Sequence, residues 1–149
     1  MLISLGGRTY LEIVEPDPLQ PQPKRPQLFG IDTLKAPRLV TWAAHGSNLA
    51  KIVENAKRRG VELGSVLSAR RQRPDGFVLS WQMTGPSMPR ADGLVPFFID
   101  WGTTAHPAKT AIAGCTLSNL RAVHPHARQI QAIVTKVGDA PRYDRTSLR

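Results

Sequence analysis

Three side chains are the strongest candidates for chemistry in this sequence: Glu12, Asp100 and His106. Glu12 lies within Tyr10–Val14, a run whose other residues are all apolar or aromatic and would occupy both faces of a strand. Because burying an unpaired charge is costly, a carboxylate in such a strand is expected to be paired, protonated or metal-bound. We therefore predict that Glu12 is a catalytic base or a metal ligand. The alternative is that its strand lies at an edge and Glu12 faces water.

Asp100 and His106 are the other two predicted catalytic residues. Asp100 lies near the end of the apolar run Val95–Trp101. Its carboxylate could reach a site there or could instead cap the loop that follows. His106 precedes a proline, which fixes an extended loop, and an imidazole suits acid–base chemistry near neutral pH. The alternative for His106 is a loop histidine bonded to the backbone. The remaining histidines, His45, His124 and His126, have weaker claims because each sits at a turn.

Five aromatic residues are predicted to line a pocket for a small ligand: Tyr10, Trp42, Trp81, Phe98 and Trp101. The alternative is that the tryptophans belong to the core. The single cysteine, Cys115, excludes an intramolecular disulfide and a cluster of several thiolates, and we expect it to be a small core residue.

The elements that must position these residues begin with a hairpin. Leu2–Leu5 and Thr9–Glu15 are two short apolar runs joined through Gly6-Gly7, a pair typical of tight turns. The prolines that follow exclude a helix or a central strand, so residues 16–37 are predicted to be a connector.

The next segment, residues 38–102, predicts a strand, a helix and three further strands. The strands are expected at Arg38–Ala44, Val61–Ala69, Phe77–Met83 and Val95–Trp101. The helix is expected to start after Ser47-Asn48 and to stop at Gly60, with Leu49, Ile52, Val53 and Ala56 on one face. Thr116–Val123 predicts another strand and Ala127–Val137 a second helix, while residues 139–149 are expected to form a poorly ordered tail.

Composition limits the function classes. The 149 residues, 41% of them hydrophobic, suit one domain, which we assign to residues 1–138. No apolar run reaches the roughly 20 residues that a membrane span requires, so we expect a cytoplasmic protein. The net charge of +9 could attract nucleic acid, but zinc-finger spacing, basic heptads and an RNP-like aromatic pattern are all missing. A basic nucleic-acid binder is therefore our third hypothesis.

Two extended segments resemble the glyoxalase-like branch of the vicinal oxygen chelate superfamily. The first joins a small-residue hairpin to Tyr10-Leu11-Glu12 and then Pro16-Asp17-Pro18. The second reads Pro96-Phe97-Phe98-Ile99-Asp100-Trp101-Gly102, followed by His106-Pro107. Cys115–Val137 is similar to the extra strand and helix of this branch, so the resemblance covers about residues 1–138.

The resemblance implies an α+β fold in which βαβββ modules form a partly open barrel around one cup-shaped site. It also implies that Glu12 could bind a divalent metal, although the histidine of the first module's opening strand is absent and the second module offers only Asp100. The first module is thus expected to be incomplete, so that either the chain is shortened or a second copy supplies the rest. We accordingly predict a homodimer.

The resemblance leaves two hypotheses for the function of this protein. The leading hypothesis is a protein that binds or transforms a small oxygenated molecule, as a lyase or dioxygenase type of metal enzyme if it is catalytic. The alternative is a non-catalytic module that binds or sequesters such a molecule.

Overall fold

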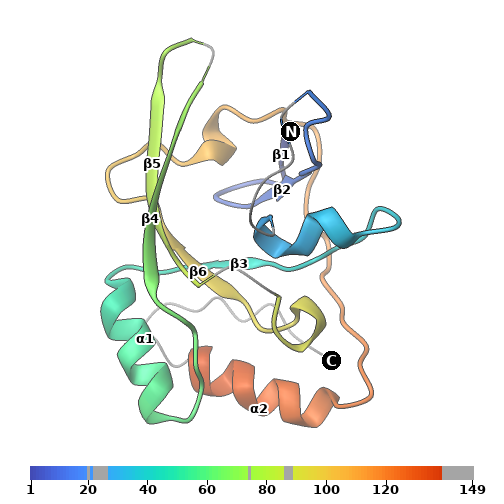
Figure 1. Cartoon of the computed structure of the whole chain (residues 1–149), viewed down its shortest axis with the longest axis vertical. Helices are drawn as coiled ribbons and strands as arrows, with labels where there is room; N and C mark the ends of the chain where they lie inside the picture. The colour runs from blue at the N-terminus through green and yellow to red at the C-terminus, as the bar shows by residue number, and fades with distance from the viewer. Residues whose placement is uncertain (20, 22–26, 74, 86–88, 139–149) are drawn as a thin grey trace.

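The main sheet contains four strands and is built from one βαβββ module. The computed structural model describes residues 1–19, 21, 27–73, 75–85 and 89–138. The module consists of β3 (Ala43–His45), α1 (Leu49–Arg58), β4 (Val66–Gln72), β5 (Val78–Thr84) and β6 (Phe97–Asp100), with strand order β3-β6-β5-β4. β3 runs parallel to β6, and the other neighbours are antiparallel. The predicted α+β class and βαβββ order are confirmed, and the sheet is open rather than closed into a barrel (Figure 1).

Two helices bury one side of this module. Asn48 caps α1, with its side chain accepting a hydrogen bond from the Lys51 amide, and Gly60 follows the helix with a positive φ of 77°. α1 packs through Leu49, Ile52 and Ala56 around Phe98, while α2 (Ala127–Gly138) contributes a further set of apolar residues. Both helices were predicted, and both lie below the sheet in the view of Figure 1.

The N-terminal hairpin forms a separate two-stranded sheet of β1 (Leu2–Ser4) and β2 (Tyr10–Glu12). Gly6 and Gly7 both have positive φ, as the predicted glycine turn requires. The hairpin is docked on the loop around η3 (Pro107–Lys109): the Ser4 amide donates to the Ile112 carbonyl at 2.7 Å, and the Leu117 amide donates to the Leu5 carbonyl at 3.2 Å.

Two predicted strands begin five residues later than expected. β3 starts at Ala43 rather than Arg38, because its partner β6 itself begins only at Phe97, the residue that pairs with Ala43. β4 starts at Val66 rather than Val61, because Gly64 has a φ of 79° that interrupts an extended chain.

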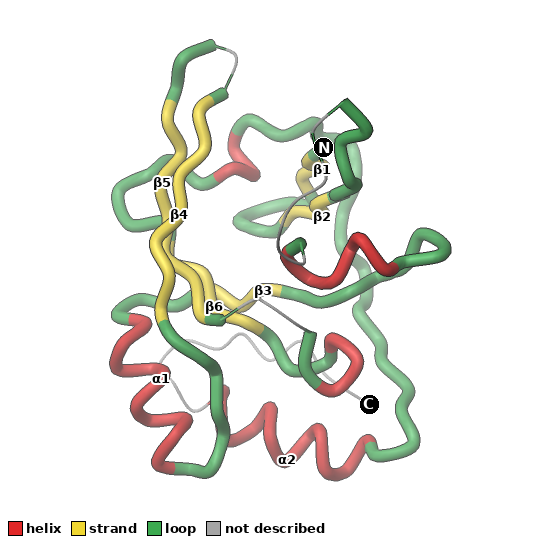
Figure 2. Tube along the Cα trace, in the orientation of Figure 1, coloured by secondary structure: helices red, strands yellow, loops and turns green. Residues whose placement is uncertain are grey.

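The prediction of a strand at Thr116–Val123 is wrong. The segment between η3 and α2 is drawn as loop in Figure 2. It forms an isolated bridge from Ile112 to Ile3 of β1, and Leu117 bonds the Leu5 carbonyl just after β1. Its apolar side chains find no common buried face, since Leu117 is 39% and Val123 is 89% exposed. Cys115, expected in the core beside that strand, is exposed for the same reason.

Two short 3-10 segments complete the described chain. η1 (Leu28–Thr33) lies in the connector, and η2 (Ala91–Gly93) precedes β6. The predicted tail, residues 139–149, and most of Gln20–Pro26 in the connector lie outside the described residues. In the part of the chain that is described, no helix is long and apolar enough to cross a membrane. The cytoplasmic location stays a prediction.

Candidate functional site

Four predicted site residues form a continuous group of rings, which we call the aromatic cluster: Tyr10, His106, Trp101 and Trp81. The ring of His106 packs edge-to-face with the ring of Tyr10, at a centroid distance of 5.6 Å, and with the ring of Trp101, at 6.1 Å. Trp101 in turn packs on Trp81 at 5.3 Å. The cluster therefore joins residues that are far apart in the sequence.

Three parts of the fold position the aromatic cluster. Tyr10 begins β2, Trp81 lies within β5, and Trp101 directly follows β6. His106 precedes η3, the same loop that carries the hairpin through its hydrogen bonds to Ser4 and Leu5. The docking of the hairpin on this loop thus sets the contact between Tyr10 and His106.

The proton position on His106 follows from its backbone bond. Nδ1 accepts a hydrogen bond from the Ala108 amide at 3.3 Å, so the neutral ring carries its hydrogen on Nε2. Burial lowers the pKa of His106, and the charges of Arg8, His45 and Lys109 lower it further. His106 is therefore neutral at pH 7 and presents Nε2–H as a donor. The backbone bond is the alternative that the sequence left open for this residue, and it leaves Nε2 available.

Trp101 holds a buried donor with no partner. The residue is only 6% exposed, and its Nε1 finds no hydrogen-bond acceptor within the described part of the chain. The other two indoles differ: Trp42 Nε1 donates to the Leu94 carbonyl at 3.0 Å, and Trp81 Nε1 donates to Met83 Sδ at 3.4 Å. An unpaired buried N–H costs free energy, which makes Trp101 Nε1 a candidate donor for a ligand.

Glu12 lies on the same face of β2 as Tyr10, since the two residues are two positions apart in a strand. Its side chain is exposed, as the edge alternative predicted, yet loss of hydration raises its pKa above the ordinary value. The N-terminal amino group and Arg71 oppose this shift. Burial and the neighbouring Glu12 raise the pKa of Tyr10 to about 12, so its hydroxyl keeps its proton at neutral pH.

The other predicted site residues lie outside the aromatic cluster. Asp100 Oδ1 accepts from the Gly102 amide at 2.8 Å, which is the turn-capping role that the sequence offered as its alternative. Phe98 is 1% exposed in the core beneath α1, and Trp42 packs against that same core. We leave these three residues out of the candidate site.

The remaining histidines lie outside the aromatic cluster. His124 Nε2 lies 3.0 Å from Asp92 Oδ2, and its Nδ1 accepts from the His126 amide. His45 is exposed and acts on the aromatic cluster only through its charge on His106.

The described residues do not fit a divalent metal. Among them, no group of three or more His, Cys, Asp or Glu side chains comes together. His106 already uses Nδ1 on the backbone, and Asp100 caps its turn. We derive no chemical step through a metal.

A family model described as a glyoxalase-like domain matches residues 1–138. The chain belongs to the glyoxalase-like domain family. This membership confirms the resemblance to the vicinal oxygen chelate superfamily and supports a general role in binding or transforming a small molecule. Comparisons with curated proteins and with solved structures found no match.

Sequence reasoning missed the features that give this site its chemistry. It named Trp101 as an aromatic wall, but the unpaired Nε1 depends on tertiary neighbours that no local pattern encodes. It also did not name Arg71 as a site residue, although the charge of Arg71 acts on Glu12.

Proposed function

We propose that this glyoxalase-like protein binds a small, uncharged, oxygenated molecule against the aromatic cluster. The observation that carries the proposal is the buried Trp101 Nε1–H without a partner. A carbonyl or hydroxyl oxygen of the ligand accepts this hydrogen bond. The Nε2–H of His106 and the hydroxyl of Tyr10 are further donors in the same group of rings.

The neutral state of these donors favours an uncharged ligand. His106 carries no charge at pH 7 because its pKa is lowered, and the Tyr10 hydroxyl is protonated. The aromatic rings supply apolar contact for the body of the ligand, and Glu12 supplies an acceptor for one of its hydroxyls. Catechol combines adjacent oxygens with an aromatic body and is therefore a suitable probe.

Calorimetry with catechol tests this proposal. Trp101→Phe keeps an aromatic ring and removes the N–H, so we expect the affinity to fall about 2- to 10-fold, as for loss of one neutral hydrogen bond. Trp42→Phe is the matched control, because the same N–H is removed from an indole that is bonded to Leu94. Equal affinity of wild type and Trp101→Phe, with normal folding, would exclude the proposed donor.

Catalysis by proton transfer is a second candidate, and the raised pKa of Glu12 favours it. Glu12 would take a proton from the carbon beside a bound carbonyl and return it, while Trp101 and His106 donate to the carbonyl oxygen. Hydroxyacetone in D₂O tests this step by NMR. We expect wild type to exchange the carbon-bound protons of hydroxyacetone faster than buffer does, and Glu12→Gln to lose this excess rate. Exchange at the buffer rate in wild type would exclude catalysis and leave ligand binding as the proposed function.

We further propose that the chain forms a single domain over residues 1–138 and assembles as a homodimer. Exposed apolar side chains on the hairpin and the loop beside it, Ile13, Val14 and Ile112, support a second copy as a cover for that region.

A further inference from the structure

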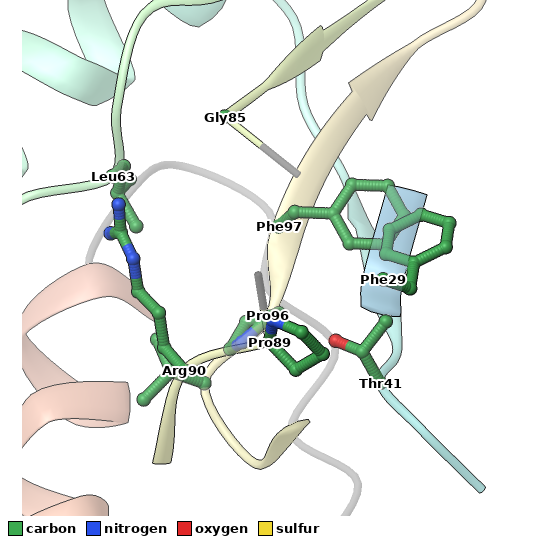
Figure 3. A pocket seen from close by; sticks show the side chains of 9 residues that line it. Phe29, Thr41, Leu63, Gly85, Pro89, Arg90, Pro96 and Phe97 are labelled. Atoms are coloured by element: carbon green, nitrogen blue, oxygen red, sulfur yellow. The ribbon is translucent and has the colours of Figure 1, made fainter. Parts of the chain in front are cut away.

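A hollow lies at the Phe97 end of β6, while Trp101 and the aromatic cluster lie at the other end. Its inner space is about 20 Å³, enough for roughly one water, within a wider hollow of about 290 Å³ that is open to solvent. Arg90 and Leu63 form one side and Phe29 and Phe97 the other, with Pro89 and Pro96 between them (Figure 3). The hollow is thus a largely apolar space with one cationic side chain, Arg90, and one hydroxyl, that of Thr41.

Arg90 lacks a counter-ion in this hollow. The residue is half-buried, and its Nη1 is fully buried without a hydrogen-bond partner among the described residues. Other arginines do have acidic partners: Arg73 lies 2.9 Å from Asp75, and Arg58 lies 3.7 Å from Glu54. A guanidinium that loses water without gaining an acceptor is costly, so the arrangement points to an anion from outside the chain.

Two glycines pack closely beside the guanidinium. A Cβ on Gly64 would stand 3.0 Å from the Cα of Gly85 and 3.6 Å from Arg90 Nη2. A side chain at position 64 would therefore crowd the Gly85 backbone, whereas its contact with Arg90 would be an ordinary van der Waals contact. The left-handed φ of 79° at Gly64 adds a backbone penalty for any such residue.

We propose that this hollow is a second binding site, which takes an organic carboxylate with an aromatic body. The planar guanidinium matches the two oxygens of a carboxylate. The small inner space suits one carboxylate oxygen, and the rest of the ligand would lie at the open mouth beside Phe29 and Phe97, whose rings pack 5.3 Å apart. The apolar walls favour such a molecule over inorganic phosphate, which would lose its hydration without contact for an organic body.

Benzoate, benzamide and inorganic phosphate are the probes for calorimetry on the full chain. We expect benzoate to bind, benzamide to bind at least about tenfold more weakly because it lacks the charge, and phosphate to bind more weakly than benzoate. Arg90→Gln should lower benzoate affinity about 10- to 100-fold, as for loss of hydrogen bonds to a charged group. Arg70→Gln, which removes an exposed arginine from β4, is the matched control and should leave the affinity within about twofold.

A measurement on the wild-type protein covers the case in which Arg90→Gln does not fold. Amide shifts caused by benzoate should concentrate at Leu63, Gly64, Gly85 and Phe97. Three results would each overturn the proposal. They are shifts concentrated at Trp101 and His106, equal binding of benzamide or phosphate, and an unchanged benzoate affinity in folded Arg90→Gln. Failure of benzoate to bind, or an unchanged affinity in Arg90→Gln, says nothing about catechol at the aromatic cluster, so the two proposals fail separately.

Discussion

The substitution Thr84→Val removes one buried hydrogen bond that holds β5 against β6. Thr84 is 0% exposed, and its Oγ1 accepts from the Phe98 amide at 3.0 Å. The ladder between these strands pairs Gln82 with Asp100 and Met83 with Ile99, and the Thr84 side chain extends it by one bond. Valine keeps the shape but leaves the Phe98 N–H without an acceptor, at a cost of about 1–3 kcal/mol in the free energy of unfolding.

Thermal unfolding followed by circular dichroism measures this cost. About 2 kcal/mol corresponds to a decrease in Tm of roughly 4–8 °C for a chain of this size. Thr84→Ser keeps the acceptor and loses one buried methyl, about 1 kcal/mol, so it should be the milder change. Thr104→Val is the matched control: its hydroxyl bonds Ser80 at an exposed position, where water can replace it. A Thr84→Val protein as stable as wild type would refute the reasoning.

Three further predictions concern the site and its assembly. NMR titration should give His106 a pKa below 6.5, and Arg8→Gln should raise that pKa. The contribution of His106 to stability is present above pH 6.5 and is lost as the pH falls through the lowered pKa. A pKa of 6.5 or higher would contradict the neutral ring. Elemental analysis after incubation with Ni²⁺, Zn²⁺, Mn²⁺ and Fe²⁺ should find no stoichiometric metal, whereas one metal per chain that disappears in Glu12→Gln would restore the chelate mechanism. Light scattering at micromolar concentration should give twice the chain mass, and a monomer would count against the dimer.

The sequence predicts those parts of the fold that local chemistry decides. Asn48 as an N-cap and Gly60 as a stop bound α1, and the glycine pair of the hairpin adopts the turn that its conformational freedom allows. The motif segments also indicated Tyr10, Trp101 and His106 together, and these residues do meet. Each of these predictions depends on neighbours in sequence or on a whole recurring motif.

The sequence could not predict what tertiary contacts decide. Thr116–Val123 has strand-forming residues, but β1 ends at Ser4, and this segment gains one hydrogen bond there, from Leu117 to the carbonyl of Leu5 just after β1. Phe98 and Trp101 both sit in one apolar motif, yet Phe98 faces the helices whereas Trp101 joins the aromatic cluster. The unpaired donors of Trp101 and Arg90 are visible only when every neighbour is in place.

The central claim is that Trp101 Nε1–H binds the oxygen of a ligand. The most direct measurement is the ¹H–¹⁵N spectrum of the three indole N–H groups during a catechol titration, with assignments from Trp101→Phe and Trp42→Phe. We expect the Trp101 signal to move downfield to saturation while the Trp42 signal, already bonded to Leu94, stays in place. A Trp101 signal that does not move while catechol binds would contradict the account.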